Sequence, residues 1–402
     1  MTEDFVRLCG EVGNYSEKIT GISIVDAYFG PDELDPSRQE NKDADVLLHD
    51  LDGVMDSLEI IEDEIRREYL LAELKSMKMT VKWLAGIEQS YSTIVQTMFN
   101  IEPKKFSESI IEKQIEAVDE SLREFPGEDL AEKASLFTKE GQVRGKALRD
   151  FIDGELQSKS ADVGQLFRDR IYTMIGQDVT DNGVKYNCVT DKPWSGYNYF
   201  KGNYTSVNEF NVDRPMNIDS ALAVVYHEYE HHVSNLWRER AYREDGFVEL
   251  SIVPLHTGRC VISEGTADTA RDFLGVKDGG PKVKAFDALY KLRRMIAINS
   301  AIMLNLEKKS VEETVQYNVE RGLRDEDASR SGLGFISPRT RDGRVNIWSP
   351  YVFTYYIGRT QFVYPMFAKA REQNELTRFY QTLYLNPFSG SSATWEKAFA
   401  WL

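Results

Sequence analysis

Three of the chain's five histidines lie within residues 227–232, which read HEYEHH. The first five residues of this run fit the pattern H-E-x-x-H, and the run lies in a segment, 220–237, whose apolar residues favour a helix. Residues four positions apart lie one above the other on the same face of a helix. His227 and His231 can therefore offer two imidazole nitrogens to one metal ion, with Glu228 beside them as a base for the attacking water.

A second helix-compatible segment, at 263–273, carries the acidic residues that such a site needs. Glu264 can act as the third ligand of a zinc site with two histidines, which leaves the fourth position for water. Asp268, one turn further along, can accept a hydrogen bond from the ring N–H of a ligand histidine. Ser263 is placed as a possible N-cap. The alternative is an amphipathic helix whose His and Glu side chains face solvent, but the presence of both halves favours one Zn²⁺ per chain.

This pair of motifs resembles the gluzincins, the thermolysin-like clan of zinc peptidases, in which H-E-x-x-H is followed by a helix with E-x-x-x-D. A closer resemblance, over about residues 20–365, is to a large, poorly characterised, mostly helical bacterial family of that clan. That family typically carries a Pro-Gly insertion between the Glu and the paired His, which this chain lacks, so its spacing is nearer to the thermolysin pattern. Blocks similar to that family's occur in the same order at 25–31, 197–210, 227–232, 263–265 and 355–358.

The rest of the chain predicts a mainly α fold of the helical gluzincin kind. Leu, Val and Ile recur at spacings of three and four within 43–88, which indicates one or two long helices. Helical patterns continue at about 107–125 and 128–176. Residues 1–176 are therefore expected to form a helical N-terminal region.

Residues 177–402 are expected to form the catalytic region, with an active-site cleft between the two halves. Its first part, 184–212, is rich in β-formers, aromatics, Asn and Gly, which predicts a small antiparallel sheet beside the H-E-x-x-H helix. The edge strand of that sheet either pairs with an extended peptide or only packs against the helix. The helices expected after the sheet are the zinc helices at 220–237 and 263–273 and the C-terminal helices within 283–402.

Hydrolysis of an amide also needs a donor that stabilises the tetrahedral oxyanion. On a helix over 350–359, Tyr351, Tyr355 and Arg359 would form one stripe, while Tyr356 would point away. We expect Tyr355 to be the catalytic donor, and it is also the tyrosine that the family resemblance indicates. The alternative is a core aromatic residue whose hydroxyl is satisfied within the fold.

Five other residues near these motifs have open roles. Arg359, His256 and Tyr351 are possible substrate contacts, although the favoured interpretation of Arg359 is a pair with one of its many acidic neighbours. His256 lies between the two motif halves, either as a second donor or as a loop histidine. His232 points off the metal face and is expected to pack or to form a hydrogen bond. Gly358 would let another backbone or a substrate approach closely.

Composition limits the partners. The net charge of −16 argues against nucleic acid, which requires a basic surface. The first residues do not resemble a signal peptide, and no apolar stretch reaches the ~18 residues needed to cross a bilayer. We therefore expect a cytoplasmic protein without membrane contact that acts on peptides; its oligomeric state is open. The alternatives are a zinc hydrolase or lyase acting on a non-peptide carbonyl, or a non-catalytic helical zinc protein. Glu228 argues against the last, because a structural zinc needs no base.

Overall fold

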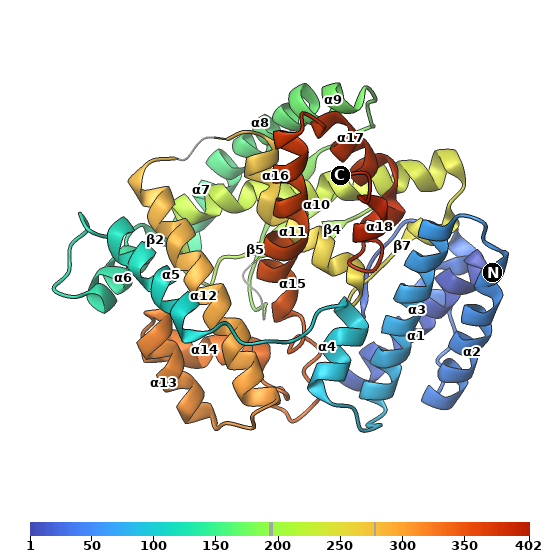
Figure 1. The fold of residues 1–402 in the computed structure, drawn as a ribbon, viewed down its shortest axis with the longest axis horizontal. Helices are drawn as coiled ribbons and strands as arrows, with labels where there is room; N and C mark the ends of the chain where they lie inside the picture. The colour runs from blue at the N-terminus through green and yellow to red at the C-terminus, as the bar shows by residue number, and fades with distance from the viewer. Residues whose placement is uncertain (193–195, 277–278) are drawn as a thin grey trace.

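The computed structural model describes residues 1–192, 196–276 and 279–402. Helices dominate these residues and the strands are short, which confirms the mainly α prediction (Figure 1). None of the helices in these ranges combines the length and hydropathy that a bilayer crossing requires.

The N-terminal helices pack side by side (Figure 1). The helical pattern expected at 43–88 forms two helices, and Asp63 caps the second by accepting a hydrogen bond from the backbone N–H of Arg66. A further helix, α5, packs against α12, and Gln114 of α5 donates to the carbonyl of Ala288. The bounds are α1 (Thr2–Thr20), α2 (Ala44–Ser57), α3 (Glu64–Leu84), α4 (Tyr91–Phe99), α5 (Glu108–Ser121) and α12 (Pro281–Asn305).

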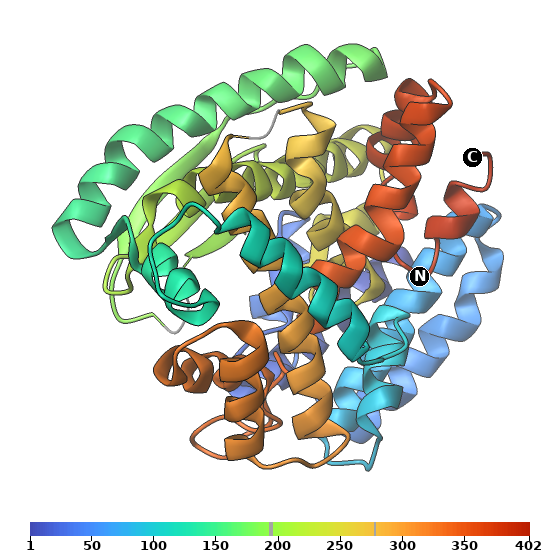
Figure 2. The same ribbon diagram turned by 60° about the vertical axis from the view of Figure 1, so that its left-hand side comes forward.

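The helix expected over 128–176 is interrupted near its start. Gly141 and Gly145 have φ angles of 69° and 58°, which end one helix and redirect the chain into the next. The later part forms one continuous helix over 145–175 that contains two π-helical turns (Figure 2). Its segments, with the elements before them, are α6 (Leu130–Lys139), β2 (Gln142–Val143), α7 (Gly145–Phe151), α8 (Gln157–Phe167) and α9 (Thr173–Ile175).

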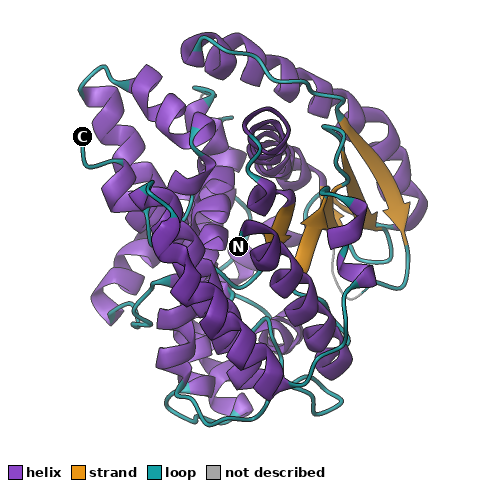
Figure 3. Cartoon of the chain, turned by 90° about the vertical axis from the view of Figure 1, so that its right-hand side faces the viewer, coloured by secondary structure: helices purple, strands orange, loops and turns teal. Residues whose placement is uncertain are grey.

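Three of the strands form one sheet on one side of the molecule (Figure 3). The strand order is β3-β5-β4, and β5 pairs antiparallel with β4 but parallel with β3. The expected purely antiparallel sheet is therefore wrong. The hairpin of β4 and β5 places β5 in the centre of the sheet, where it runs in the same direction as β3. The strands are β3 (Val184–Val189), β4 (Gly196–Phe200) and β5 (Ser206–Asn211).

Two further strand pairs tie distant segments together. Strand β1 (Val25–Tyr28) pairs antiparallel with β7 (Ile252–Pro254), so the N-terminal region reaches the segment between the two motif helices. Strand β2 pairs with β6 (Met216–Asn217) directly before the H-E-x-x-H helix. The sequence patterns did not reveal either pairing.

The two motif helices are longer than expected. α10 (Ile218–Asp245) begins at Asn217, whose side chain accepts a hydrogen bond from the backbone N–H of Ser220. α11 (Gly258–Phe273) begins five residues before Ser263. The expectation that Ser263 caps α11 is therefore wrong, and its side chain is free for another role.

The C-terminal helices surround this pair. A continuous helix over 352–372, in the region where the sequence predicted a helix, packs against α11 and contains a π-helical turn at Gly358–Val363. Two large apolar clusters form the core, and each contains residues from both 1–176 and 177–402. The bounds are α13 (Val311–Gly322), α14 (Glu326–Ile336), α15 (Val352–Ile357), α16 (Tyr364–Glu372), α17 (Leu376–Tyr380) and α18 (Trp395–Ala398).

Candidate metal centre

The three predicted ligands lie together where α10 packs on α11. The Nε2 atoms of His227 and His231 are 3.1 Å apart, and they lie 3.4 and 3.7 Å from Oε2 of Glu264. Ligand atoms at ~2.0–2.1 Å from a tetrahedral zinc ion are about 3.3 Å from one another. The observed triangle therefore has the size that a zinc ion would require.

The Glu264 carboxylate supports this fit. Its Oε2 atom is buried and has no hydrogen-bond partner within the described residues. A buried carboxylate oxygen without a partner is costly, and a bound cation would offset that cost. The side chains of His227 and His231 remain 19% and 17% exposed, so the ligand triangle is still open to solvent on one side.

Each ligand is held by a second side chain. Nδ1 of His227 donates to Oδ1 of Asp268 at 2.8 Å, as the sequence predicted. Nδ1 of His231 lies 3.0 Å from Oγ of Ser263. Such contacts fix the rings so that Nε2 is presented to the ion. The role of Ser263 was not foreseen, because a serine one residue before the Glu ligand has no distinctive sequence signal.

The charges of the triangle are strongly coupled. Burial would raise the pKa of Glu264, but the imidazoles of His227 and His231 hold it well below its usual value. Burial likewise lowers the pKa of His227, yet the hydrogen bond to Asp268 and the nearby Glu264 carboxylate leave it well above the usual range. The Glu264 carboxylate is thus charged beside the two imidazoles, and because zinc binds neutral imidazoles, we expect metal binding here to depend on pH.

Glu228 and Tyr355 lie beside the triangle with their polar groups uncommitted. In the described part of the chain, neither side chain forms a hydrogen bond, and both are partly exposed. By contrast, Tyr351 is buried, and its hydroxyl donates to Oε1 of Glu264 at 2.9 Å. Tyr356 points away and packs edge-on against Phe106, with ring centroids 5.5 Å apart. Tyr351 and Tyr355 therefore lie on the predicted side of the helix and Tyr356 on the other. Tyr351, however, holds the metal ligand Glu264.

The two other possible substrate contacts are engaged elsewhere. Arg359 pairs with Asp272, with Nη1 and Oδ2 2.9 Å apart, and also donates to the carbonyl of Asp268. His256 is buried in a left-handed conformation, and its Nε2 lies 2.6 Å from the carbonyl oxygen of Ile347. Burial lowers the pKa of His256 to about 4, so its ring is neutral at physiological pH. These contacts favour the simpler interpretation of each residue: Arg359 forms a surface ion pair, and His256 is a loop histidine.

A buried polar cluster anchors α10 on a side of the helix that does not carry the ligand triangle. Asp181 accepts hydrogen bonds from Nε2 of His232 at 3.0 Å and from the hydroxyl of Tyr229 at 2.8 Å, and it pairs with Arg168 at 3.1 Å. The other ring nitrogen of His232 lies 2.9 Å from Oγ of Ser206 on β5. His232 therefore forms hydrogen bonds, as expected, and does not belong to the ligand triangle.

The N-terminal region also reaches the site. The hydroxyl of Tyr197 on β4 donates to Oδ1 of Asp26 on β1 at 2.5 Å. Burial raises the pKa of Asp26, and the hydrogen bond from Tyr197 and the charges of Arg259 and His231 offset this only in part. The sequence blocks at 25–31 and 197–210 thus meet beside a ligand histidine, although sequence spacing alone did not predict this.

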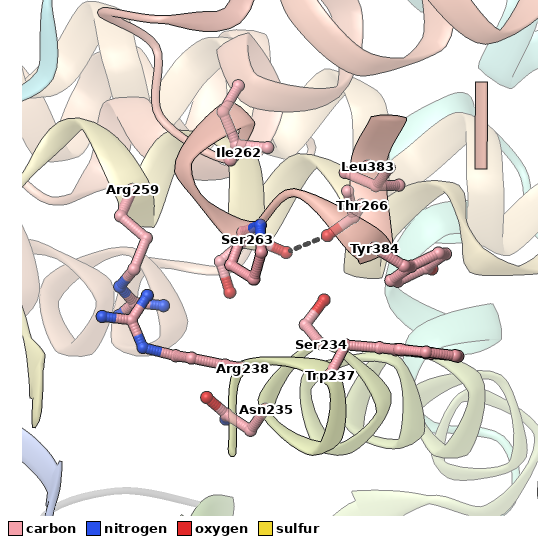
Figure 4. A pocket seen from close by; sticks show the side chains of 12 residues that line it. Ser234, Asn235, Trp237, Arg238, Arg259, Ile262, Ser263, Thr266, Leu383 and Tyr384 are labelled. Atoms are coloured by element: carbon pink, nitrogen blue, oxygen red, sulfur yellow. Dashed lines mark hydrogen bonds between the residues drawn. The ribbon is translucent and has the colours of Figure 1, made fainter. Parts of the chain in front are cut away.

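A small cavity of about 50 Å³ lies between α10, α11 and the C-terminal segment (Figure 4). Ser263, which contacts His231, is on its wall, together with Ser234 and Thr266. The buried carboxylate of Glu230 accepts hydrogen bonds from both Ser234 and Thr266. The cavity has room for about one or two water molecules, which is too little for a substrate. We therefore assign it to the packing that supports the ligand residues.

Comparisons with known proteins concern the fold. The sequence matches no protein-family model and no curated protein. The structure is similar to that of a "putative lipoprotein" from Colwellia psychrerythraea, with a TM-score of 0.53 and 11% identity over 88% of this chain and 66% of that protein. A second, more distant match is a "putative lipoprotein of unknown function" from Shewanella oneidensis, with a TM-score of 0.45 and 10% identity over 89% of this chain and 72% of that one. This chain thus has a fold similar to that of the Colwellia protein and spans slightly less than two thirds of its length.

Proposed function

We propose that this protein is a zinc-dependent peptidase of the gluzincin kind. The observation that carries the proposal is the triangle of His227, His231 and Glu264, which has zinc dimensions and lies next to the uncommitted carboxylate of Glu228. A structural zinc site closes its fourth position with a protein ligand, whereas a catalytic site keeps it open beside a base. The resemblance of both motif halves to gluzincins supports the same assignment.

The ion, when bound, would polarise the scissile carbonyl and lower the pKa of the attacking water. Glu228 would accept the proton from that water and return it to the leaving amine. Tyr355 would donate its hydroxyl to the oxyanion, because Tyr351, the other candidate on this stripe, already donates to Glu264. Asp268 and Ser263 would keep the two imidazoles in their required orientation.

The sheet offers a place for the substrate backbone. Strand β4 is the last strand in the order β3-β5-β4, packs against α10, and carries Tyr197, which bonds to Asp26 near the site. In our proposal an extended peptide pairs with β4 and passes its scissile bond over the metal. The alternative, in which β4 serves only for packing, predicts that backbone N-methylation of a substrate would not change its binding.

The test uses the Glu228→Gln variant loaded with zinc. We expect this variant to retain one zinc per chain by elemental analysis and to lose hydrolysis of a peptide library monitored by mass spectrometry. The matched control is His49→Ala, which removes an exposed histidine on α2 and should leave zinc content and hydrolysis unchanged. Hydrolysis that survives Glu228→Gln would refute the mechanism. Bound zinc without turnover of any peptide by the unaltered protein would favour a non-peptide carbonyl substrate.

A further inference from the structure

An arginine on α12 lies against the candidate active site. The guanidinium of Arg294 lies over the ring of Tyr355, 4.1 Å from its centroid, and over the ring of Tyr290 at 4.7 Å. The Tyr290 hydroxyl donates to Oδ2 of Asp268 at 3.1 Å, and Asp268 holds the ligand His227. Arg294 is therefore connected to the ligand His227 through Tyr290 and Asp268.

Arg294 has no acidic partner of its own. Within the described residues it forms no ion pair, whereas Arg359 and Arg271, which also lie near α11, pair with Asp272 and Asp287. The nearest carboxylate that acts on Arg294 is that of Asp268, and its oxygens already accept from His227 and Tyr290. This is notable in a chain with 65 acidic and 49 basic residues.

A second positive group strengthens the local charge. Arg324, at the start of the turn between α13 and α14, has a pKa that burial and the like charge of Arg294 lower and that the neighbouring Asp325 restores only in part. Partly buried guanidinium groups that repel each other raise the free energy of the folded state unless an anion binds between or beside them. The positive charge therefore favours an anionic ligand near the metal site.

The groups around the guanidinium of Arg294 indicate which kind of anion would bind there. The rings of Tyr355 and Tyr290 lie against the guanidinium of Arg294, and the Tyr290 hydroxyl also shares a hydrogen bond with it, which leaves the remaining N–H groups for an acceptor. A guanidinium edge binds a planar carboxylate with two parallel hydrogen bonds. Tyr290 is 40% exposed and Arg294 is partly exposed, so a ligand can reach this edge from solvent.

We propose that Arg294 is a specificity-determining residue that binds a carboxylate group of the peptide substrate next to the scissile bond. The proposal rests on the peptidase function proposed above and names the substrate class for that site. The carboxylate comes from one of two sources, the free C-terminus of the peptide or an Asp or Glu side chain beside the cleaved bond. Arg359, the arginine that the sequence analysis considered as a possible substrate contact, is already paired with Asp272.

Binding can be measured without turnover in the zinc-loaded Glu228→Gln protein. Three fluorescent peptides are compared by anisotropy: one with a free C-terminus and neutral side chains, its C-terminal amide, and the amide with one Asp. We expect Arg294→Met to weaken binding of a carboxylate-bearing peptide about 10- to 100-fold, as for a hydrogen bond to a charged group, and to leave the neutral amide unchanged. The peptide that responds identifies the source of the carboxylate.

Two further variants make the test specific. Lys291→Met removes a positive charge from an exposed position of the same helix and should change no affinity. Arg294→Lys keeps the charge but loses the planar fork, so we expect several-fold weaker binding of the responsive peptide even if Arg294→Met does not fold.

Equal binding of all three peptides by the unaltered site, or an equal effect of Arg294→Met on all three, would overturn the inference. The proposed function is judged separately, by hydrolysis in the protein that retains Glu228. Arg294-dependent binding of a carboxylate peptide in a protein that hydrolyses no peptide would support this inference and contradict the peptidase proposal.

Discussion

Gly265 on α11 and Gly358 at the start of the π-helical turn after α15 lie against each other without intervening side chains. A Cβ atom on Gly358 would lie 2.0 Å from the carbonyl oxygen of Val261, and one on Gly265 would lie 2.5 Å from the carbonyl carbon of Gly358. Neither glycine has a positive φ angle, so close backbone approach is the reason for both. This contact sets the distance between Tyr351 on one helix and Glu264 on the other.

We predict that Gly358→Ala forces these helices apart. The added methyl group should lower the free energy of unfolding by about 1–3 kcal/mol, as overpacking typically does, and should weaken zinc binding because Tyr351 is withdrawn from Glu264. Urea denaturation and a chelator competition measure the two effects. Gly53→Ala in α2 is the control: its new Cβ meets nothing within 4 Å, so we expect a gain of about 0.5–1 kcal/mol and unchanged zinc binding.

A second prediction concerns the metal itself. His227→Ala combined with His231→Ala should abolish zinc binding, because two of the three ligand atoms are lost. Asp268→Asn should weaken zinc binding about 10- to 100-fold without unfolding the chain, since it replaces the charged acceptor that orients His227 by a neutral amide. Titration against a competing chelator measures both, and zinc content that stays the same in the double variant would contradict the assignment.

The tyrosine stripe gives a third prediction, in which two residues behave differently. Tyr355→Phe should lower kcat about 10²- to 10³-fold and leave KM nearly unchanged, because its hydroxyl acts mainly in the transition state. Tyr351→Phe should instead weaken zinc binding, because its hydroxyl donates to Glu264. Tyr356→Phe, which removes a hydroxyl from the ring that packs on Phe106, should change neither. A near-normal kcat for Tyr355→Phe would assign that residue to packing.

Local patterns explain which parts of the site the sequence predicted. His227, His231 and the Glu264–Asp268 pair have fixed spacings on helices, so the 3.6-residue period brings each set to one face. The same period placed the tyrosines over 351–356. Most of these relations join residues one helical turn apart on the same helix. The other relation joins the two motif helices, whose residues would bind the same ion.

Relations across the fold were not accessible in this way. Asp181 lies in a loop and Ser263 in a helix interior, and neither has a spacing that marks it as a partner of a histidine. The strand pairing of β1 with β7 joins residues more than 200 positions apart, and such pairings depend on the packing of the whole chain. The direction of β3 in the sheet was missed for the same reason, because alternation predicts a strand but not its neighbour.

The last prediction concerns the buried polar cluster that anchors α10 and its dependence on pH. Burial would raise the pKa of Asp181, but hydrogen bonds from His232 and Tyr229 lower it to about 2. Because an unfolded Asp has a pKa of ~3.9, folding favours the charged form. Its contribution to stability is therefore complete above about pH 4 and is lost as the pH falls through about 2.

Asp181→Asn should lower the free energy of unfolding at pH 7 by about 3–5 kcal/mol, the usual cost of removing one partner from a buried ion pair. The difference between the variant and the unaltered protein should shrink as the pH falls from about 4 toward 2, because protonation neutralises Asp181 in the unaltered protein as well. Urea denaturation at a series of pH values measures this difference, in which the titration of the other carboxylates cancels. Asp342→Asn, which disrupts an exposed pair with Arg344, is the control and should show little difference at any pH. A difference for Asp181→Asn that stays constant from pH 7 to pH 2 would mean that the shape of the side chain, and not its charge, stabilises α10.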